Sequence, residues 1–205
     1  MPETTPVEDL MLEHGILNRI LIIFKEIDTR IKNNVPFSLQ SVNKAATIIR
    51  TFIEDNHEAM EEKYIFPIVV KNSNVETIAI VNELIKQHKL GRIFTDTILE
   101  LTCKQSLDKN EKVQLLSAIR RFVYMYRTHE AIEDTIIFTE FKKYISNSDY
   151  KILNDIFEEN EDKTIGKNGV ENIINIIGQI EKELRITIFD VSHKVFDSKR
   201  DLYHK

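Results

Sequence analysis

The chain has 205 residues, a formal net charge of −5, and 42% hydrophobic and 30% charged residues. This composition is that of an ordinary globular protein and excludes an intrinsically disordered chain. The acidic net charge, with no concentrated basic stripe, argues against a nucleic-acid-binding protein. No apolar run reaches the roughly 20 residues that a membrane span needs.

The cysteine content and the N-terminal residues indicate the compartment. The single cysteine, Cys103, has no partner for an intramolecular disulfide, so nothing points to an oxidising compartment. The first residues lack the basic region and the apolar core of a secretory signal. We therefore expect a cytoplasmic protein that associates with neither a membrane nor nucleic acid.

Helical periodicity runs through the sequence, and no run alternates apolar and polar residues as a strand would. The first predicted helix ends at Asn33, Asn34 and Pro36. The second begins at Ser38, a good N-cap, and kinks or breaks at Pro67, which removes a backbone donor. The four long predicted helices cover about residues 7–33, 38–71, 75–104 and 110–146. Short connections make neighbouring helices antiparallel, which gives an up-down-up-down four-helix bundle.

The sequence after the fourth helix is less regular. A helix over about residues 149–161 is followed by a break at 166–169, and a second amphipathic helix spans about 173–184. We therefore expect an all-α fold in two parts. Residues 1–147 form the four-helix bundle, and residues 148–205 form a C-terminal helical extension that packs on or beside it.

The second and fourth predicted helices contain an internal repeat. Residues 57–66 read HEAMEEKYIF and residues 129–138 read HEAIEDTIIF, so six of the ten positions are identical. The first and third helices also carry one histidine each, His14 and His88. The pattern indicates one helical hairpin used twice, with a histidine on each of the four helices.

The four histidines are predicted to lie at one depth in the bundle. Neighbouring histidines stand at similar distances from the turn that connects their helices, and at 1.5 Å per residue the positions match to within about 3 Å. A single histidine on an apolar helix face is usually a satisfied core residue. Four at equal depth favour a shared role.

Two glutamates share the predicted inner face with the histidines. Glu61 and Glu133 follow His57 and His129 at i+4, a spacing that places both side chains on one face of the helix. Burying two carboxylates and four imidazoles is costly unless a pair of cations compensates. Imidazole and carboxylate ligands without a thiolate suit iron or manganese, and such a site also accepts zinc.

Other polar residues lie near the predicted cluster. Glu62 and Asp134 are about 140° round the helix from the two histidines and are therefore expected to point away from the centre. The hydroxyl of Tyr64 either finds a partner in the core or acts on a species at the metals. Tyr126 is a weaker candidate of the same kind. Arg92 is placed to reach a carboxylate near the site.

The motifs that carry a family resemblance are Glu13-His14, His57-Glu58-x-x-Glu61-Glu62-x-x-Ile65-Phe66-Pro67, His88 and His129-x-x-x-Glu133. Over about residues 8–146 the chain resembles the hemerythrin-like HHE cation-binding family, and residues 150–184 resemble the C-terminal extension of many such proteins. The resemblance implies a centre of two iron ions. Its ligands would be four terminal histidines and two bridging glutamates: His14, His57, His88, His129, Glu61 and Glu133.

One departure from the family bears on function. Oxygen-carrying hemerythrins have a fifth histidine four residues after the third-helix ligand, where this chain has Arg92. Their last carboxylate is an aspartate five residues after the fourth-helix histidine, where Asp134 lies, yet the internal repeat favours Glu133. These differences disfavour simple reversible oxygen carriage.

Three functions follow from this pattern. The leading hypothesis is a di-iron protein that binds or processes a small oxidant, namely dioxygen, nitric oxide or peroxide, in a stress response or in iron-centre repair. The second is an iron or oxygen sensor without turnover, which signals to a protein partner through the C-terminal segment. The third is a structural bundle without metal. Whether the protein is an enzyme stays open.

Overall fold

The structure is a computed structural model that describes residues 5–186. Residues 1–4 and 187–205, which include His193 and His204, lie outside the described residues, and so does the end of the predicted extension. All regular secondary structure between residues 5 and 186 is helical. No helix in this range is both long and apolar enough to cross a bilayer.

Four long helical segments follow one another along the chain. The first is α1 (Pro6–Lys32) and the third is α5 (Val75–Thr102). The second consists, without a break, of α2 (Leu39–Ile48), η1 (Ile49–His57), α3 (Glu58–Met60), η2 (Glu61–Ile65) and α4 (Phe66–Asn72), where η marks π-helical turns. The fourth consists of α6 (Lys109–Ile132), η3 (Glu133–Ile137) and α7 (Phe138–Tyr144). The extension adds α8 (Asn147–Ile165) and α9 (Gly169–Glu183).

Side-chain caps set the starts of these segments. In each cap the side chain accepts a hydrogen bond from the backbone N–H three residues further on, which satisfies one of the free donors of a helix start. The capping residues are Thr5, Ser38, Asn74, Asp108 and Ser146. The predicted limits of the four long helices are therefore confirmed to within a few residues.

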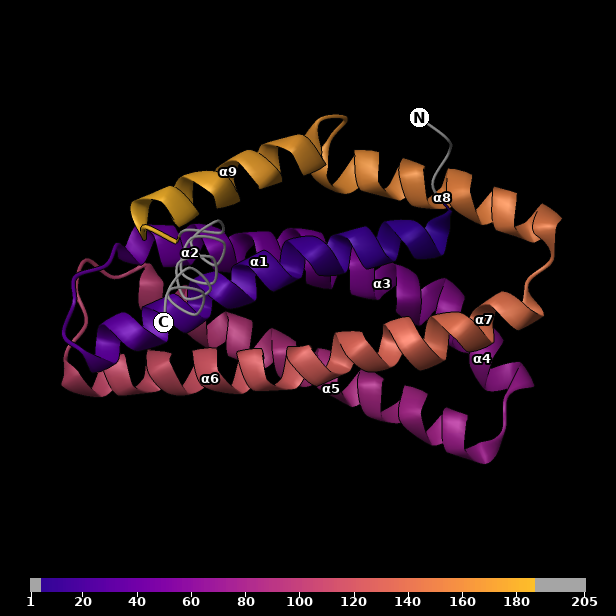
Figure 1. Ribbon diagram of the computed structural model, residues 1–205, viewed down its shortest axis with the longest axis horizontal. Coiled ribbons are helices and arrows are strands. Elements are labelled where there is room, and N and C mark those ends of the chain that lie inside the picture. Colours follow the sequence, from indigo (N-terminus) through magenta and orange to yellow (C-terminus); the bar gives the residue numbers. More distant parts are fainter. Residues whose placement is uncertain (1–4, 187–205) are drawn as a thin grey trace, which may run out of the picture.

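The four long segments form a closed bundle (Figure 1). In it α1 packs against α6, α6 against α5, α5 against α2, and the π-helical η1 against α1. The connections are short, so neighbouring segments run antiparallel, as the sequence predicts for an up-down-up-down bundle.

Two apolar clusters fill the bundle, one toward each end. The first cluster includes Phe24, Phe52, Ile98 and Phe122, and the second includes Leu10, Phe66, Leu84, Phe138 and Phe141. Each long segment carries one of the four predicted site histidines, and this histidine lies between residues of the first cluster and residues of the second. The four histidines therefore form a polar layer that is enclosed by apolar packing along the bundle axis.

The two helices of the extension lie along one side of the bundle (Figure 1). Helix α8 packs on η1 and α1, and α9 packs on α1 and α2. The left-handed backbone of Gly166 (φ 81°) allows the turn between them. Leu153 and Phe157 of α8 join one apolar cluster, and Ile173 and Ile177 of α9 join the other. The division of the chain into two domains stays a prediction.

The second helix does not simply kink at its proline. The π-helical turn η2 ends directly before the short helix that contains Pro67 near its start. The fourth helix has an equivalent π-helical turn, η3, at the repeated position and without a proline. The wide turns therefore belong to the repeat, and each begins at one of the two predicted inner glutamates, Glu61 and Glu133. Single π turns inside α-helices are frequent at functional sites.

Candidate metal centre

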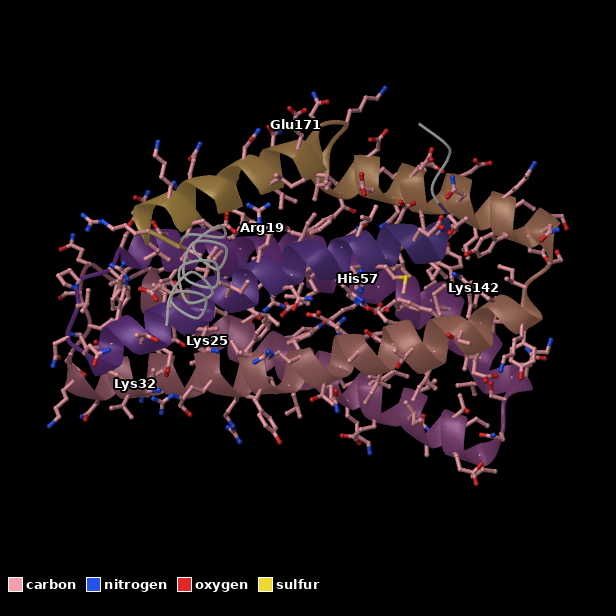
Figure 2. All side chains as sticks on the ribbon, viewed as in Figure 1. Arg19, Lys25, Lys32, His57, Lys142 and Glu171 are labelled. Atoms are coloured by element: carbon pink, nitrogen blue, oxygen red, sulfur yellow. The ribbon has the colours of Figure 1, made fainter. Side chains whose placement is uncertain are left out.

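The six residues predicted to share one site do converge in the bundle interior. All are buried, with exposed fractions between 0% and 3%, and they are His14, His57, Glu61, His88, His129 and Glu133. His57 projects from its helix into the space between the bundle helices (Figure 2). The cluster draws one histidine from each of the four long segments and one glutamate from each of the π-helical turns η2 and η3.

The Nε2 atoms of the histidines face the two glutamates. Nε2 of His57 lies 3.5 Å from Oε1 of Glu61, and Nε2 of His129 lies 3.0 Å from Oε1 of Glu133. Across the bundle, Nε2 of His14 is 3.5 Å from Oε2 of Glu133. Two donor atoms that bind one ion at about 2.1 Å each lie roughly 3.0–3.5 Å apart. These separations therefore fit shared cations.

The donor atoms fall into two groups that share Glu133. One group is His14, His57, Glu61 and Glu133, and the other is His88, His129 and Glu133. Glu61 also approaches the second group, because its Oε2 lies 3.6 Å from Nε2 of His88. The two glutamates are thus positioned to contact two cations at once.

The outer nitrogen of each histidine is held by an acceptor. Nδ1 of His57 lies 2.6 Å from Oε2 of Glu13, and Nδ1 of His14 lies 2.9 Å from Oδ1 of Asp134. The other two Nδ1–acceptor pairs, both at 2.9 Å, are His88 with Glu62 and His129 with Gln87. When the carboxyl groups are ionised, their oxygens and the amide oxygen of Gln87 only accept, so each Nδ1 carries the proton and each neutral ring turns a lone pair inward. Such outer partners fix the tautomer of metal-binding histidines.

The interior is therefore crowded with acceptors. Nε2 of His88 lies only 3.1 Å from Nε2 of His129. None of the four carboxylate oxygens of Glu61 and Glu133 has a hydrogen-bond donor. Buried polar atoms without partners are rare and need an explanation. Cations between these lone pairs supply one, so the residues present fit a metal pair.

The pKa values indicate how strongly this interior attracts positive charge. Burial raises the pKa of Glu61 well above its usual value, and the adjacent carboxylate of Glu133 adds to the effect. Burial opposes protonation of His14, but its hydrogen bond to Asp134 and the nearby carboxylate of Glu133 raise its pKa well above the ordinary value. Protons are thus retained where no metal supplies the charge, and metal binding would release them.

His57, which lies in the same donor group as His14, has a pKa that shifts the opposite way. Burial lowers the pKa of His57 well below its usual value, and the neighbouring His14 ring adds to this shift. A neutral imidazole is the form that binds a metal.

Aromatic rings cover the outer side of two histidines. Phe138 stacks on His14 with ring centroids 5.8 Å apart, and Phe66 stacks on His88 at 5.7 Å. Both phenylalanines end the repeated ten-residue motif. They hold the imidazole rings in place and keep water from that side of the cluster.

Arg92 is confirmed to reach carboxylates beside the cluster. Its Nη2 lies 2.9 Å from Oε2 of Glu58 and 3.1 Å from Oε1 of Glu62. Glu58, Glu62 and His88 also form a group with the spacing of a cation site. The guanidinium already supplies the cation there, so we do not count it as a third metal position.

Tyr126 belongs to the same polar layer. Its hydroxyl donates to Oε1 of Glu58, and its ring centroid lies 5.3 Å from that of His129. Burial raises the pKa of Glu58 to about 7. Tyr64, in contrast, is half-buried, and its described contacts are with Phe157 of α8 and with the ammonium of Lys63. That arrangement agrees with core filling.

Sequence reasoning missed the outer partners of the histidines. Glu13 and Gln87 each directly precede a histidine, and they bond to the ring on the neighbouring helix. Glu62 and Asp134 were expected to point away, but each bonds to a histidine across the bundle. The repeat held a signal for this pair, because an acidic residue follows the inner glutamate in both copies.

Fold and cluster together define the class of protein: a helical bundle with a buried histidine and glutamate cation-binding site. The model of the hemerythrin HHE cation-binding domain matches residues 5–102. The chain is also 34% identical over 193 residues to uncharacterised proteins of Mycobacterium tuberculosis and Mycobacterium bovis, covering 94% of this chain and 74% of theirs. The chain belongs to the hemerythrin HHE cation-binding family. No solved structure matched it.

Proposed function

We propose that this protein is a non-heme di-iron protein that binds or processes a small oxidant. One iron would lie at His14 and His57 and the other at His88 and His129, with Glu61 and Glu133 bridging them. The observation that carries the proposal is the convergence of inward lone pairs and unpaired carboxylate oxygens in a buried interior. Membership of a cation-binding family supports it.

The donor chemistry favours iron. Imidazole and carboxylate ligands suit iron and manganese, and zinc binds to similar sets. Manganese or zinc in place of iron is therefore the main alternative for the ions themselves.

The ligand count favours a reactive centre. Six protein ligands shared between two ions leave coordination positions for an exogenous molecule. Bound iron would supply redox chemistry there, for dioxygen, nitric oxide or peroxide. Phe66 and Phe138 limit the access of water, and Arg92 lies where oxygen carriers have a further histidine. This difference favours a role in a stress response or in iron-centre repair over reversible oxygen carriage.

The test is metal analysis followed by spectroscopy. Protein from iron-replete cells should contain about two irons per chain, and its near-ultraviolet absorption should change on exposure to dioxygen, nitric oxide or peroxide. His57→Ala should lose iron, whereas Tyr64→Phe, outside the cluster, should keep it. A folded protein without metal, or with iron that responds to none of the three oxidants, would contradict the proposal.

One chain of contacts favours a sensor as the second candidate. Oε2 of Glu13 bonds to His57, and its Oε1 accepts from Nδ2 of Asn56 at 3.4 Å. Oδ1 of Asn56 in turn accepts from Nδ2 of Asn160 in α8 at 2.7 Å. The candidate ligand His57 is thus linked to the extension through a chain of hydrogen bonds.

Limited proteolysis tests the sensor. Cleavage at the turn between α8 and α9 should slow when iron is bound, and Asn160→Ala should weaken this dependence. Asn154→Ala is the matched control, because the described hydrogen bond of Asn154 stays within α8, to Glu158. Equal cleavage with and without iron would exclude signalling through the extension.

A further inference from the structure

The candidate metal centre consists of two copies of one contact pattern. The pair His14 and Asp134 corresponds to His88 and Glu62, and both Nδ1–oxygen distances are 2.9 Å. The stacked ring of Phe138 on His14 corresponds to that of Phe66 on His88. The direct ligand candidates therefore give the two metal positions nearly equal surroundings.

Two corresponding pairs break this equality. Nδ1 of His57 is held by the carboxylate of Glu13, whereas Nδ1 of His129 is held by the neutral amide of Gln87. The repeat makes Glu13 and Gln87 equivalent, because each directly precedes the histidine of its own helix. A carboxylate acceptor makes the imidazole a stronger electron donor than an amide does.

The second difference lies four residues after His14 and His88. On the first helix Asn18 donates to the carboxylate of Glu130, and on the third helix Arg92 pairs with the equivalent Glu58. Asn18 is neutral, but Arg92 is a cation whose pKa is raised further by the carboxylates of Glu58 and Glu62, although burial opposes this. The first position thus lacks the positive charge that the second has.

The surrounding charges add in the same direction. The His14 and His57 position has carboxylates at Glu13, Asp134 and Glu130 and no lysine or arginine in these contacts. The other position has carboxylates at Glu58 and Glu62, an amide at Gln87, and the guanidinium of Arg92. A dication is attracted more strongly to the more negative of two otherwise similar sites.

We propose that the two metal positions are unequal, so that a divalent ion fills the His14 and His57 position first and the His88 and His129 position second. Glu13, Gln87 and Arg92 set this order as positioning residues that act through the histidines and the local charge. The inference rests on the proposed function only in requiring that both positions bind metal. The second ion is then the exchangeable one.

The test is a stepwise titration of metal-free protein with cobalt(II), followed by its visible absorption under argon. Wild-type protein should bind two ions in two resolved steps. Glu13→Gln should weaken the first step by about 10–100-fold, the usual effect of losing an outer partner. Gln87→Glu should strengthen the second step by about 10-fold and leave the first unchanged. Arg92→Asn, which copies the residue of the first half, should also strengthen the second step.

A spectroscopic readout separates this role from a structural one. After loading with iron-57, wild-type protein should give two distinct Mössbauer quadrupole doublets, and Gln87→Glu should bring them together. Helical circular dichroism of the metal-free variants checks that they fold. If Gln87→Glu is unfolded, Arg92→Asn takes its place in both measurements.

The outcomes distinguish the two proposals. Binding of fewer than two ions by the wild type would overturn the proposed di-metal function. Two bound ions with steps that none of the variants changes would overturn only the inequality. Weakening of the second step by Glu13→Gln would reverse the proposed order and overturn it as well.

Discussion

The hydroxyl of Tyr126 occupies the space that a side chain at position 91 would need. A β-carbon on Gly91 would lie 2.2 Å from the Tyr126 oxygen and 2.9 Å from the ring carbon that bears it. The absent side chain lets the third and fourth helices approach, so that the phenol reaches Glu58. A glycine inside a helix costs about 1 kcal/mol relative to alanine, and here it allows a buried hydrogen bond beside the candidate metal centre.

Gly91→Ala should therefore destabilise the protein despite its better helix propensity. We expect a loss of about 1–3 kcal/mol in the free energy of unfolding, typical of overpacking. Urea unfolding measures it. The double variant Gly91→Ala, Tyr126→Phe should recover part of the loss, because the oxygen is the nearest atom. Additive effects of the two substitutions would contradict the contact.

Glu61→Gln should change stability and metal binding in opposite directions. The folded-state pKa of Glu61 is raised above its unfolded value, so its contribution to stability is lost as pH rises through the folded pKa. At pH 8 the amide should therefore stabilise the metal-free protein by about 1–3 kcal/mol, the usual cost of an unsatisfied buried group. It should also lower the bound metal below two ions per chain.

Urea unfolding at pH 8 and elemental analysis measure the two effects of Glu61→Gln. Glu159→Gln is the control, because Glu159 is 67% exposed and pairs with a lysine in its own helix. A variant that keeps two ions would show that Glu61 is not a bridging ligand.

The pH dependence of the metal-free protein should change in Glu130→Gln. Burial raises the pKa of Glu130 to about 7 from its usual value of 4.5. Between these values the folded state holds a proton that the unfolded state releases, so stability falls as pH rises from 4.5 to 7. The variant should lack this fall, which amounts to at most about 3 kcal/mol.

Urea titrations of both proteins at pH 5 and pH 8 measure the difference. The variant should gain stability relative to the wild type on going to pH 8. Parallel curves would mean that Glu130 has an ordinary pKa in the folded protein.

Arg19 should hold the extension on the bundle. Its Nε and Nη2 bond to the two carboxylate oxygens of Glu181 in α9 at 2.9 and 2.7 Å, and it lies between α1 and α9 in Figure 2. Glu181 is 6% exposed, so Arg19→Met should leave its charge without a partner at a cost of about 1–3 kcal/mol.

Hydrogen exchange in α9 provides the local measurement, because its amides should lose protection before those of α5. Lys25→Met is the control on the exposed side of the same helix. The double variant Arg19→Met, Glu181→Met should recover much of the loss. Unchanged exchange in α9 after Arg19→Met would mean that apolar packing alone holds the extension.

Sequence periodicity alone was enough to predict the four long helices. The apolar spacing and the capping residues Ser38 and Asp108 are local signals, and helix starts depend mainly on such local chemistry. The depth of the four histidines followed from the constant rise of a helix, and the inward direction of Glu61 and Glu133 from their i+4 spacing. These features depend on residues close in the sequence, so the sequence could predict them.

The π-helical turns lie beyond this reasoning. An expected angle of 100° per residue placed Glu62 and Asp134 on an outer face. The wide turns η2 and η3 reduce the angle between successive residues. Glu61 and Glu62 therefore reach two sides of the same cluster, as Glu133 and Asp134 do. No residue type in the sequence marks a π turn reliably.

The helices, the repeat and the set of residues that meet at the centre were predictable from local sequence patterns. Which acceptor holds each histidine depends on long-range packing, because Glu13, Gln87, Glu62 and Asp134 bond across the bundle to residues 26 to 120 positions away. Their identity depends on how neighbouring helices are rotated against each other. That rotation is set by packing over the whole core, as at Gly91 and Tyr126, and no local pattern encodes it.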